Sequence, residues 1–348
     1  MINFILKIIL LPFAFVYGLV MEARNLLYAL GVLPVHRFDV PLISVGNITA
    51  GGTGKTPFVV YLARLLAGRF KRIAVISRGY GRKGKGLRVV SDGRRILLGP
   101  QEGGDEPALI ARKLPDVPVI VAERRREAIR RALEEFKADC ILMDDAFQHR
   151  SVWRDADIVL WNFRDAWRFN WPLPAGRLRE FKNNLKRAHL LVFTNMNPGE
   201  ALPQIPLDVP KFAVMSRLQY LVDLDFNQVG SLSELRDKKT AAFAGIAHPQ
   251  NLRRSLNEEG IKPRIFFPFK DHHRYTIKDL KKMITVCRQE NIATLLCTEK
   301  DLVKIGAVSA IKDFLQTEKI NLLGVAMDLR MRDEDLFISE IENLLQIK

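Results

Sequence analysis

Cysteine is scarce in this sequence, which contains three in 348 residues: Cys140, Cys287 and Cys297. No two of them lie at C-x-x-C spacing and their number is odd, so the sequence offers neither a zinc-binding pattern nor a disulfide framework. This excludes the disulfide-stabilised secreted scaffolds and indicates a reducing compartment. Internal repeats and low-complexity tracts are absent as well.

Acidic residues are outnumbered by basic ones, 39 to 54, which gives a formal net charge of +15. Such a charge suggests an anionic partner, namely phosphates, an acidic membrane face or nucleic acid, and a generally solvated basic surface is the simpler alternative. The basic residues are not interleaved with aromatic residues in one stripe, and no nucleic-acid-reading motif appears. We therefore expect no nucleic-acid partner.

An uninterrupted hydrophobic run long enough to span a bilayer is also lacking. Residues 8–21 carry no charge, but Lys7 and Pro12 interrupt any longer apolar run, and a spanning helix needs about 20 apolar residues. No small-x-small cleavage site of a signal peptide precedes Glu22. We expect residues 1–35 to form a helical segment at a membrane interface, with a buried core helix and a true span as the alternatives.

The stretch PLISVGNITAGGTGKT, residues 41–56, has the pattern of a phosphate-binding loop. An apolar run ends in a glycine-rich turn, and apolar residues resume at helical spacing after Pro57. Backbone N–H groups at the start of such a helix converge on an anion. Lys55 would reach the β and γ phosphates, and the Thr56 hydroxyl would ligate Mg²⁺. The predicted nucleotide-binding residues are Thr49, Ala50, Gly51, Gly52, Thr53, Gly54, Lys55 and Thr56.

One position departs from the strict G-x-x-x-x-G-K-[ST] pattern, because Thr49 stands where the pattern has glycine. A chance GGTGKT in a flexible loop is therefore the alternative to a phosphate loop. The apolar run before the turn and the helical pattern after it are where the motif requires them, and they favour the phosphate loop.

Apolar runs and helical patterns alternate along the rest of the chain, and 48% of the residues are hydrophobic. This alternation predicts an α/β fold of the P-loop NTPase type, with a mostly parallel sheet covered by helices on both faces, plus a smaller C-terminal α/β domain. We expect the P-loop domain at 36–215 and the C-terminal domain at 216–348, with the amphipathic last helix as a candidate to pack back on the first. The strands of the first domain are predicted at 72–77, 117–122, 140–143, 157–161 and 190–194, with helices at 105–114 and 124–136.

Two acidic motifs are candidates for the chemistry. Asp144 and Asp145 follow the apolar run CILM, where carboxylates at the end of a parallel strand suit a Mg²⁺ site, although a helix cap or a solvated turn would also explain them. Asp105 lies in GGDEP and could be a general base that takes a proton from an acceptor hydroxyl, or merely a cap of the following helix. The spacing alone does not decide between these roles.

The histidines carry a weaker signal. Asp271, His272 and His273 are consecutive, and neighbouring histidines do not share one face of a helix or strand, so both need not act. No further Cys/His cluster completes a metal site. A surface loop and a catalytic loop are equally compatible with this motif, whereas a structural role is the better interpretation of His149.

Two other functional classes fit part of these residues. A P-loop ATPase that drives a partner protein or the assembly of a metal centre would need the phosphate loop, but it would need neither Asp105 nor His272. A basic nucleic-acid-binding module would explain only the net charge and none of the motifs.

The ordered motifs of the chain resemble those of one family, the tetraacyldisaccharide 4'-kinases of the lipid A pathway. The motifs are VGNITAGGTGKTP, SRGYGRK, GDEP, DDAFQHR, LPAGRLRE, FAGIAHP, DHH and TEKD. The resemblance covers most of the chain, and Thr49 stands where the family places it. It implies transfer of the γ-phosphate of ATP, with Mg²⁺, to the 4'-hydroxyl of a tetraacylated glucosamine disaccharide 1-phosphate. The product would be lipid IVA, made on the cytoplasmic face of the bacterial inner membrane by a peripheral or monotopic enzyme.

The resemblance also implies roles for single residues. Asp105 matches the general base, His272 the histidine that supports it, and Asp144 and Asp145 the magnesium-associated carboxylates. Arg125, Arg179 and Glu180 fall where the family has residues important for activity. Two departures concern local geometry: Ala146 replaces a usual glycine, and Phe181 a usual proline. We expect the active site in the cleft between the two domains, and domain closure to bring Asp105 and His272 together.

Overall fold

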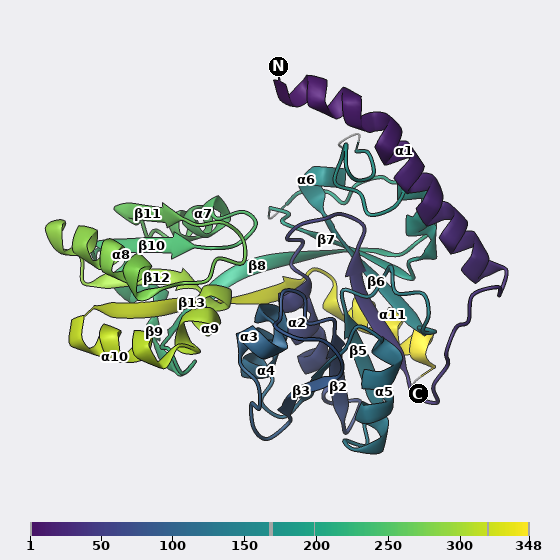
Figure 1. Cartoon of the computed structure of the whole chain (residues 1–348), viewed down its shortest axis with the longest axis horizontal. Helices are drawn as coiled ribbons and strands as arrows, with labels where there is room; N and C mark the ends of the chain where they lie inside the picture. Colours follow the sequence, from purple (N-terminus) through teal and green to yellow (C-terminus); the bar gives the residue numbers. More distant parts are fainter. Residues whose placement is uncertain (1, 167–169, 198, 319, 347–348) are drawn as a thin grey trace. The chain divides into compact units, whose positions relative to one another are not determined.

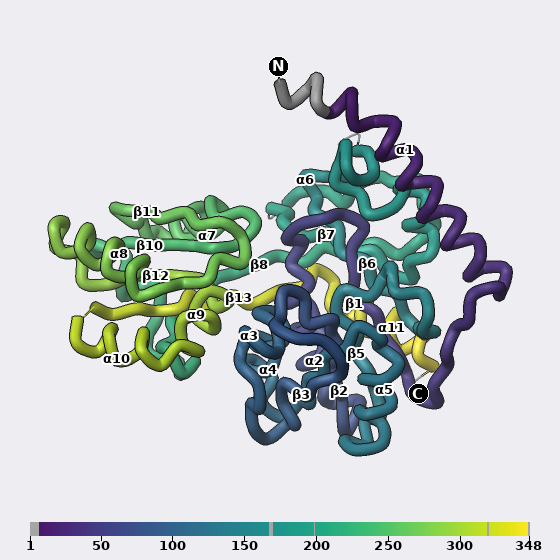
Figure 2. Tube along the Cα trace, viewed as in Figure 1, coloured from purple at the N-terminus to yellow at the C-terminus, as the bar shows by residue number. Residues whose placement is uncertain are grey.

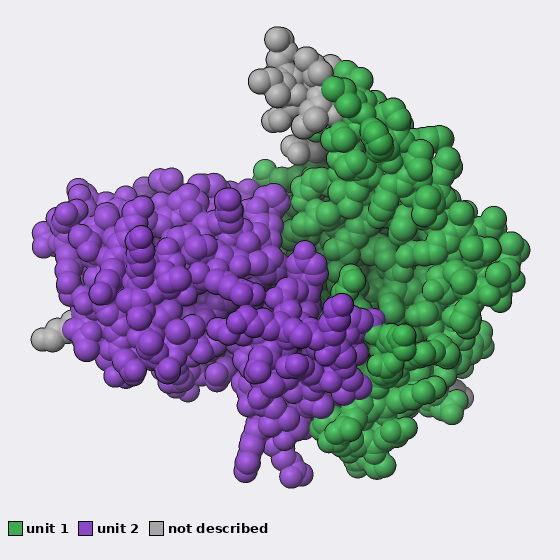
Figure 3. Space-filling model, viewed as in Figure 1, with its two compact units in different colours: residues 1–78, 124–215, 329–348 green, residues 79–123, 216–328 purple. Residues whose placement is uncertain are grey.

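The computed structural model describes residues 2–166, 170–197, 199–318 and 320–346, and it divides into two compact units (Figure 3). Unit 1 consists of Met1–Arg78, Arg124–Met215 and Leu329–Lys348, and unit 2 of Gly79–Glu123 and Ser216–Asp328. The chain passes from unit 1 to unit 2 after Met215, at the expected domain boundary. The units differ from the expected domains in three segments, since 79–123 belongs to unit 2, whereas 1–35 and 329–348 belong to unit 1.

Unit 1 is built on a parallel sheet with the strand order β8-β7-β6-β1-β5-β2 (Figure 1). Its strands are β1 (Leu42–Asn47), β2 (Ile73–Ser77), β5 (Cys140–Asp144), β6 (Ala156–Asn162), β7 (Leu190–Thr194) and the first part of β8 (Lys211–Val222). Most of their residues are buried, as expected for parallel strands that are covered on both faces. Val45 lies opposite Asp144 in the register, so the carboxyl ends of β1 and β5 are neighbours.

Helices pack on this sheet and complete the α/β fold that the sequence predicts. They are α2 (Lys55–Leu66), α5 (Arg125–Glu134), α6 (Phe163–Ala166), the 3-10 helix η1 (Lys182–Arg187) and α11 (Glu334–Leu345). The last helix, α11, buries Phe337, whose ring lies 6.1 Å from that of Phe58 in α2 and 5.1 Å from that of Phe212 in β8. These ring contacts hold the C-terminal end of the chain on unit 1.

Unit 2 contains a second parallel sheet, in the order β11-β10-β12-β13, together with the antiparallel pair β3–β4. Its strands are β3 (Arg88–Asp92), β4 (Pro118–Val121), β9 (Gln228–Ser231), β10 (Thr240–Ala244), β11 (Ile265–Pro268), β12 (Thr294–Thr298) and most of β13 (Asn321–Met331). Its helices are α3 (Pro100–Gly103), α4 (Asp105–Lys113), η2 (Leu232–Leu235), α7 (Gln250–Glu258), α8 (Ile277–Gln289), α9 (Glu299–Gly306) and α10 (Ser309–Glu318).

Residues 79–123 join unit 2 because α4 packs on α9. Ala108 and Leu109 of α4 form an apolar cluster with Val303 of α9. At the end of α4, the Lys113 ammonium lies 2.7 Å from the Glu299 carboxylate, and both side chains are about nine-tenths buried. These contacts join segments that are far apart in sequence. Patterns of consecutive residues do not reveal such contacts, so the sequence predicts that 79–123 belongs to the P-loop domain.

The N-terminal helix α1 (Ile2–Ala29) continues through Pro12 (Figure 2). Among the described residues, it is the one helix that is long and apolar enough to cross a membrane by length and composition, over Lys7–Ala29. Only 17% of the apolar window is buried, and side chains such as Phe13 (64% exposed) and Val20 (60%) face outward. The structure therefore gives no support to the interpretation of this segment as a buried core helix.

Candidate active site

The glycine-rich loop lies between β1 and α2, as the sequence predicts. Gly51 has φ 115° and Gly54, the residue before α2, has φ 81°, in the region of backbone conformation that favours glycine. Lys55 and Thr56 open α2, so their N–H groups belong to the first turn, which has no hydrogen-bond acceptor inside the helix. Backbone donors and the positive end of the helix dipole thus meet here, as a phosphate group requires.

A segment more than 120 residues further along the chain supports the loop. The Ala50 N–H donates to the Arg177 carbonyl oxygen at 2.7 Å, and the Arg177 guanidinium donates back to the Ala50 carbonyl oxygen at 2.9 Å. The Arg179 N–H donates to the Ile48 carbonyl oxygen at 2.8 Å. The loop is therefore held by a neighbouring backbone segment and does not depend on its glycines alone for its shape.

The structure also explains Thr49, the departure from the strict motif. Thr49 forms a β-bridge with Leu178 and is 1% exposed. It is not among the described residues with positive φ, so its position does not require glycine. The Asn47 side chain donates to the Thr53 hydroxyl at 2.8 Å across the loop. Thr49 therefore helps to hold the loop in place through its bridge to Leu178.

Lys55, Asp145 and Arg179 come together beside the loop. The Asp145 carboxylate lies 3.4 Å from the Lys55 ammonium and 2.7 Å from the Arg179 guanidinium. Burial raises the pKa of Asp145, but the two cations outweigh burial and hold that pKa below its usual range. The positive φ of the turn falls on Asp145 itself, at 49°, and the buried Ala146 needs none. The alanine at 146 is therefore compatible with this turn.

Asp144 is the last residue of β5 and is 1% exposed. The Ser77 hydroxyl donates to its carboxylate at 3.0 Å. Since Asp144 ends a strand, it is not a helix cap. Among the described residues, no three His, Cys, Asp or Glu side chains gather as a metal cage. The nearby oxygen donors, Thr56 and the two aspartates, match the hard ligands of Mg²⁺, which proteins hold through one or two carboxylates together with phosphate oxygens.

Asp105 opens α4 in unit 2, but it does not cap the helix with its side chain. The residue before the helix is Gly104, with φ 98° and no side-chain cap. The Asp105 carboxylate is hydrogen-bonded to the His272 ring instead, with 2.9 Å between Oδ2 and Nδ1. The structure therefore brings together two sequence candidates that lie 167 residues apart. It also corrects one expectation: both residues belong to unit 2, so no domain closure is needed to unite them.

The two consecutive histidines point to different partners, as the sequence suggested. His272 has φ 57°, and its backbone N–H donates to the Asp271 carboxylate at 3.0 Å, which supports this uncommon conformation. The ring of His273 packs 4.6 Å from that of Phe269 and lies 3.3 Å from the Asp279 carboxylate. His273 is therefore part of the packing of unit 2, and His272 is the histidine that meets Asp105.

Arg125 and His149 are neighbours in unit 1. Arg125 is the first residue of α5 and is 4% exposed. Burial, followed by the Arg125 and Arg154 charges, lowers the pKa of His149 to about 4. His149 is therefore neutral at pH 7, and its ring nitrogen lies 3.1 Å from the Ser151 hydroxyl. These contacts agree with a structural role for His149.

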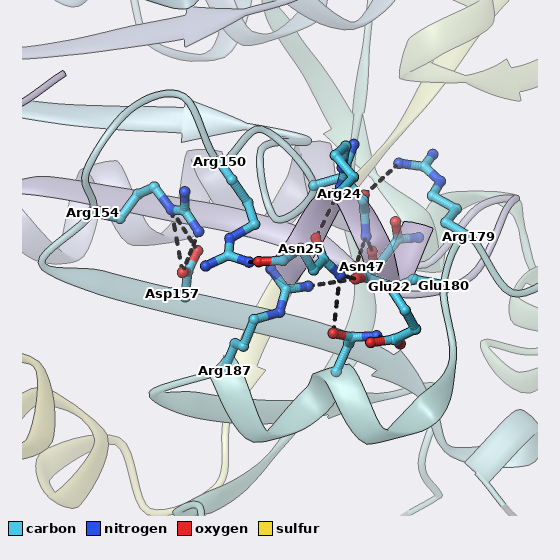
Figure 4. Close-up of polar contacts among 12 residues, drawn as sticks. Glu22, Arg24, Asn25, Asn47, Arg150, Arg154, Asp157, Arg179, Glu180 and Arg187 are labelled. Carbon is cyan, nitrogen blue, oxygen red and sulfur yellow. Dashed lines mark hydrogen bonds and ion pairs between the residues drawn. The ribbon is translucent and has the colours of Figure 1, made fainter. Parts of the chain in front are cut away.

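Glu180 is fully buried and is surrounded by hydrogen-bond donors (Figure 4). Its carboxylate accepts from Asn25 of α1 at 2.9 Å, from Gln148 at 2.9 Å and from Arg187 at 2.6 Å. Gln148 donates as well to the Asn47 carbonyl oxygen, at the end of β1. Glu180 thus links α1 to the strand that carries the phosphate loop. Both of its oxygens are engaged in these hydrogen bonds.

Phe181, the other departure, packs against α1. Its ring lies 6.5 Å from that of Phe15, and it covers Gly18, where a Cβ atom would overlap it. Its φ of −61° is one that proline also adopts. A proline or a phenylalanine therefore suits the backbone at 181, and phenylalanine adds a contact with the N-terminal helix.

Sequence reasoning missed two residues of this site, Gln148 and Asn25. Gln148 lies inside the quoted motif DDAFQHR, so the motif contained a signal for it, and Arg177 was expected only as one of several arginines near the motifs that could bind phosphate. Asn25 lies in an apolar helix and carries no pattern that predicts its contact with Glu180. Only the folded chain brings it to that carboxylate.

Comparisons with known proteins agree with this geometry. A family model described as tetraacyldisaccharide-1-P 4'-kinase matches residues 6–346. A tetraacyldisaccharide 4'-kinase of Chlorobium luteolum is 38% identical over 317 residues, covering 86% of this chain and 87% of the relative. One of Syntrophus aciditrophicus is 37% identical over 343 residues, covering 91% and 89%. A crystal structure of LpxK from Aquifex aeolicus in complex with ATP matches with a TM-score of 0.80 and 33% identity, covering 98% and 99% of the two chains.

Proposed function

The chain belongs to the tetraacyldisaccharide-1-P 4'-kinase family, and from this premise we propose how its residues carry out the reaction. It is an ATP-dependent kinase that transfers the γ-phosphate to the 4'-hydroxyl of a tetraacylated glucosamine disaccharide 1-phosphate, which forms lipid IVA in lipid A biosynthesis. The single observation that carries the assignment of residues is the Asp105–His272 contact, because an ATPase without a hydroxyl acceptor needs no such pair.

ATP binds at the loop between β1 and α2. The backbone N–H groups of residues 51–56 surround the phosphates, and Lys55 neutralises the β and γ phosphates, while Thr49 and Ala50 hold the loop through their contacts with residues 177 and 178. Asp145, which pairs with Arg179, holds the Lys55 ammonium beside the loop. Preorganised charges of this kind stabilise the phosphoryl group in transfer without rearranging during the reaction.

The oxygen donors near the loop fit Mg²⁺. Thr56, Asp144 and Asp145 would hold it directly or through water, and Ser77 orients Asp144. Bound there, Mg²⁺ would supply positive charge that offsets the negative charge developing on the transferred phosphoryl group. Lys55 and Arg179 keep Asp145 ionised, which favours this ligand role.

Asp105 acts as the general base, and His272 supports it. Asp105 Oδ2 is hydrogen-bonded to His272, and we propose that Oδ1 accepts the proton of the 4'-hydroxyl. The hydroxyl oxygen then attacks the γ-phosphorus in line with the leaving β-phosphate oxygen. Asp105 belongs to unit 2 and the phosphate loop to unit 1.

Arg125 and Glu180 have supporting roles in this proposal. Arg125 adds positive charge to unit 1, close to His149, and Arg179 adds charge beside Asp145. Glu180 positions α1 and the end of β1 through Asn25 and Gln148. These roles predict that changes at Glu180 act through the shape of the site.

The enzyme works at the cytoplasmic face of the inner membrane, where an acceptor with four acyl chains resides. The exposed apolar side chains of α1 enter the membrane interface, and the net charge of +15 adds attraction to anionic lipid. Asn25 and Tyr17 attach α1 to unit 1, since the Tyr17 hydroxyl donates to the Arg179 carbonyl oxygen at 3.0 Å. The helix that meets the membrane therefore also contacts the segment that supports the phosphate loop.

The assay that tests the proposal supplies labelled ATP and the tetraacylated disaccharide 1-phosphate to the full-length chain, and it separates the lipid product by thin-layer chromatography. The wild type is expected to label the disaccharide. Asp105→Ala is expected to lower turnover by about 10²–10⁴-fold, the range for loss of a general base, with unchanged ATP binding. Near-normal turnover of this variant would remove Asp105 as the base, and ATP hydrolysis without labelled lipid would favour the ATPase class.

A further inference from the structure

The TEKD motif, residues 298–301, has no role in the mechanism described so far. Thr298 caps α9, and Asp301 accepts from the Tyr275 hydroxyl at 3.0 Å and pairs with Lys304. Glu299 pairs with Lys113 of α4. These three residues therefore have clear structural functions, and Lys300 remains to be explained.

Lys300 lies against the residues that are next to the two members of the base pair. Its ammonium is 3.2 Å from the Glu106 carboxylate and 3.8 Å from the Asp271 carboxylate. Glu106 follows Asp105 at the start of α4, and Asp271 precedes His272. Lys300 thus contacts both segments that the Asp105–His272 hydrogen bond joins, through Glu106 in one and Asp271 in the other.

The position of Lys300 is unfavourable for helix formation by itself. It is the second residue of α9, where the helix dipole favours negative charge, and its side chain is 17% exposed. Burial lowers the pKa of Lys300, but the Glu106 and Asp271 carboxylates outweigh burial and raise it overall. The acidic neighbours therefore favour the charged form of this lysine despite its burial.

Stability alone does not account for this arrangement. Glu106 and Asp271 are about one-third exposed, and ion pairs to exposed carboxylates contribute little to folding free energy. Asp271 has a second task, because its carboxylate accepts the backbone N–H of His272, whose φ is 57°. A cation that fixes Asp271 therefore also fixes the turn that aims the His272 ring.

We propose that Lys300 is a positioning residue of the phosphoryl transfer, which holds the Asp105 and His272 segments together through Glu106 and Asp271. This inference rests on the proposed role of Asp105 as the base. Lys300 does not touch the reacting atoms in this assignment. A displacement of the base by about 1 Å can cost up to 10²-fold in rate, so loss of this contact affects turnover more than nucleotide binding.

The test compares Lys300→Met, Lys300→Arg and Lys113→Met in the full-length chain with ATP and the acylated disaccharide. Lys300→Met is expected to lower kcat by about 10- to 100-fold with the KM for ATP within about twofold. Lys300→Arg keeps the charge and the reach and is expected to recover most of the lost turnover. Lys113→Met is the matched control, because it breaks the other buried lysine–glutamate pair between α4 and α9, and it is expected to lower the thermal midpoint but not kcat.

A double-mutant cycle with Asp105→Ala separates this inference from the proposed function. If Lys300 acts through the base, Lys300→Met lowers the residual turnover of Asp105→Ala no further. An equal loss in both backgrounds, or full kcat in Lys300→Met, would overturn the inference and leave Asp105 as the base. Normal turnover of Asp105→Ala alone would instead remove Asp105 as the base, the proposed role on which this inference rests. If Lys300→Met does not fold, the double variant Lys300→Met/Glu106→Gln replaces it in the same cycle. The second substitution removes the Glu106 charge that Lys300→Met leaves unpaired.

Discussion

Position 104 requires glycine, because the turn before α4 leaves no room for a side chain. Gly104 has φ 98°, and a Cβ atom there would lie 3.2 Å from the Gly79 Cα and 3.3 Å from the Tyr80 carbonyl oxygen. Asp105 is the next residue, so this turn determines where the proposed base stands. In the GDEP motif, a glycine that the backbone conformation requires therefore directly precedes the carboxylate of the proposed base.

Gly104→Ala is expected to lower kcat by at least about tenfold, and to lower the free energy of unfolding by about 1–3 kcal/mol, because alanine is strained at this φ and crowds the loop at 79–80. Gly99→Ala is the matched control. Gly99 also precedes a helix of unit 2, but it has φ −78° and its added Cβ meets only the Ala307 Cβ, at 3.9 Å. Steady-state kinetics and urea denaturation of both variants check the prediction. A fully active Gly104→Ala would mean that the turn does not position Asp105.

His149 makes the stability of the chain depend on pH. Its pKa is about 4 in the folded chain and 6.5 when unperturbed. Between these values the unfolded chain binds the proton and the folded chain does not, so stability is lost as the pH falls below about 6.5. From pH 7 to pH 5 the loss from this group alone is about 2 kcal/mol.

The measurement is urea denaturation of the wild type and of His149→Gln at both pH values. Glutamine does not titrate, so the pH-dependent loss is expected to be smaller in the variant by about 2 kcal/mol, whatever its absolute stability. Equal losses in the two proteins would mean that burial and the neighbouring arginines do not keep His149 neutral.

Helix α1 has two different faces, and each has its own function in our proposal. One face carries Asn25, which reaches Glu180, and Gly18, which Phe181 covers. The other carries exposed apolar side chains such as Phe13 and Val20. Deleting the helix would disturb both faces, so substitutions on the exposed face are the sharper test of membrane binding.

The double variant Phe13→Ser/Val20→Ser is expected to bind vesicles of phosphatidylethanolamine and phosphatidylglycerol at least about tenfold more weakly than the wild type, because it removes two side chains whose burial is worth about 1.5–3 kcal/mol each. Sedimentation with vesicles measures this. Val229→Ser is the control, since Val229 is an apolar side chain of unit 2 with 50% exposure. Undiminished sedimentation of the double variant would show that α1 is not the membrane contact.

Among the elements, those with strong local patterns were predicted best. The strands β1, β2, β5, β6 and β7 are apolar runs, and each lies within two residues of its expected position. Strand β8 was not predicted, and β13 was expected only at 320–327. Each of them passes from one unit to the other, with polar residues interspersed, and their register depends on partners far away in sequence.

The whole molecule differs from its predicted plan in how segments are grouped. Residues 79–123 lie within the first half of the chain, yet α4 packs on α9 and makes them part of unit 2. The prediction that Asp105 and His272 meet only after domain closure was wrong for this reason. Domain closure on ATP and acceptor stays a prediction. The phosphate loop is formed within unit 1 and the Asp105–His272 pair within unit 2, so closure is not needed to form either of them.

The sequence by itself determined the local features of this protein: the α/β alternation, the phosphate loop at 41–56, and the identities of Asp105, Asp144 and His272. Strand patterns, glycine turns and motifs are properties of consecutive residues, so they can be read without a fold. The family resemblance implied that His272 supports Asp105, and the tertiary structure shows the contact between them in place of a side-chain cap of α4. The tertiary structure alone decided that Arg177 and Arg179 support the loop and that Lys300 joins the neighbours of the base. Those contacts join residues up to 194 positions apart, and only the packing of helices and sheets sets such distances.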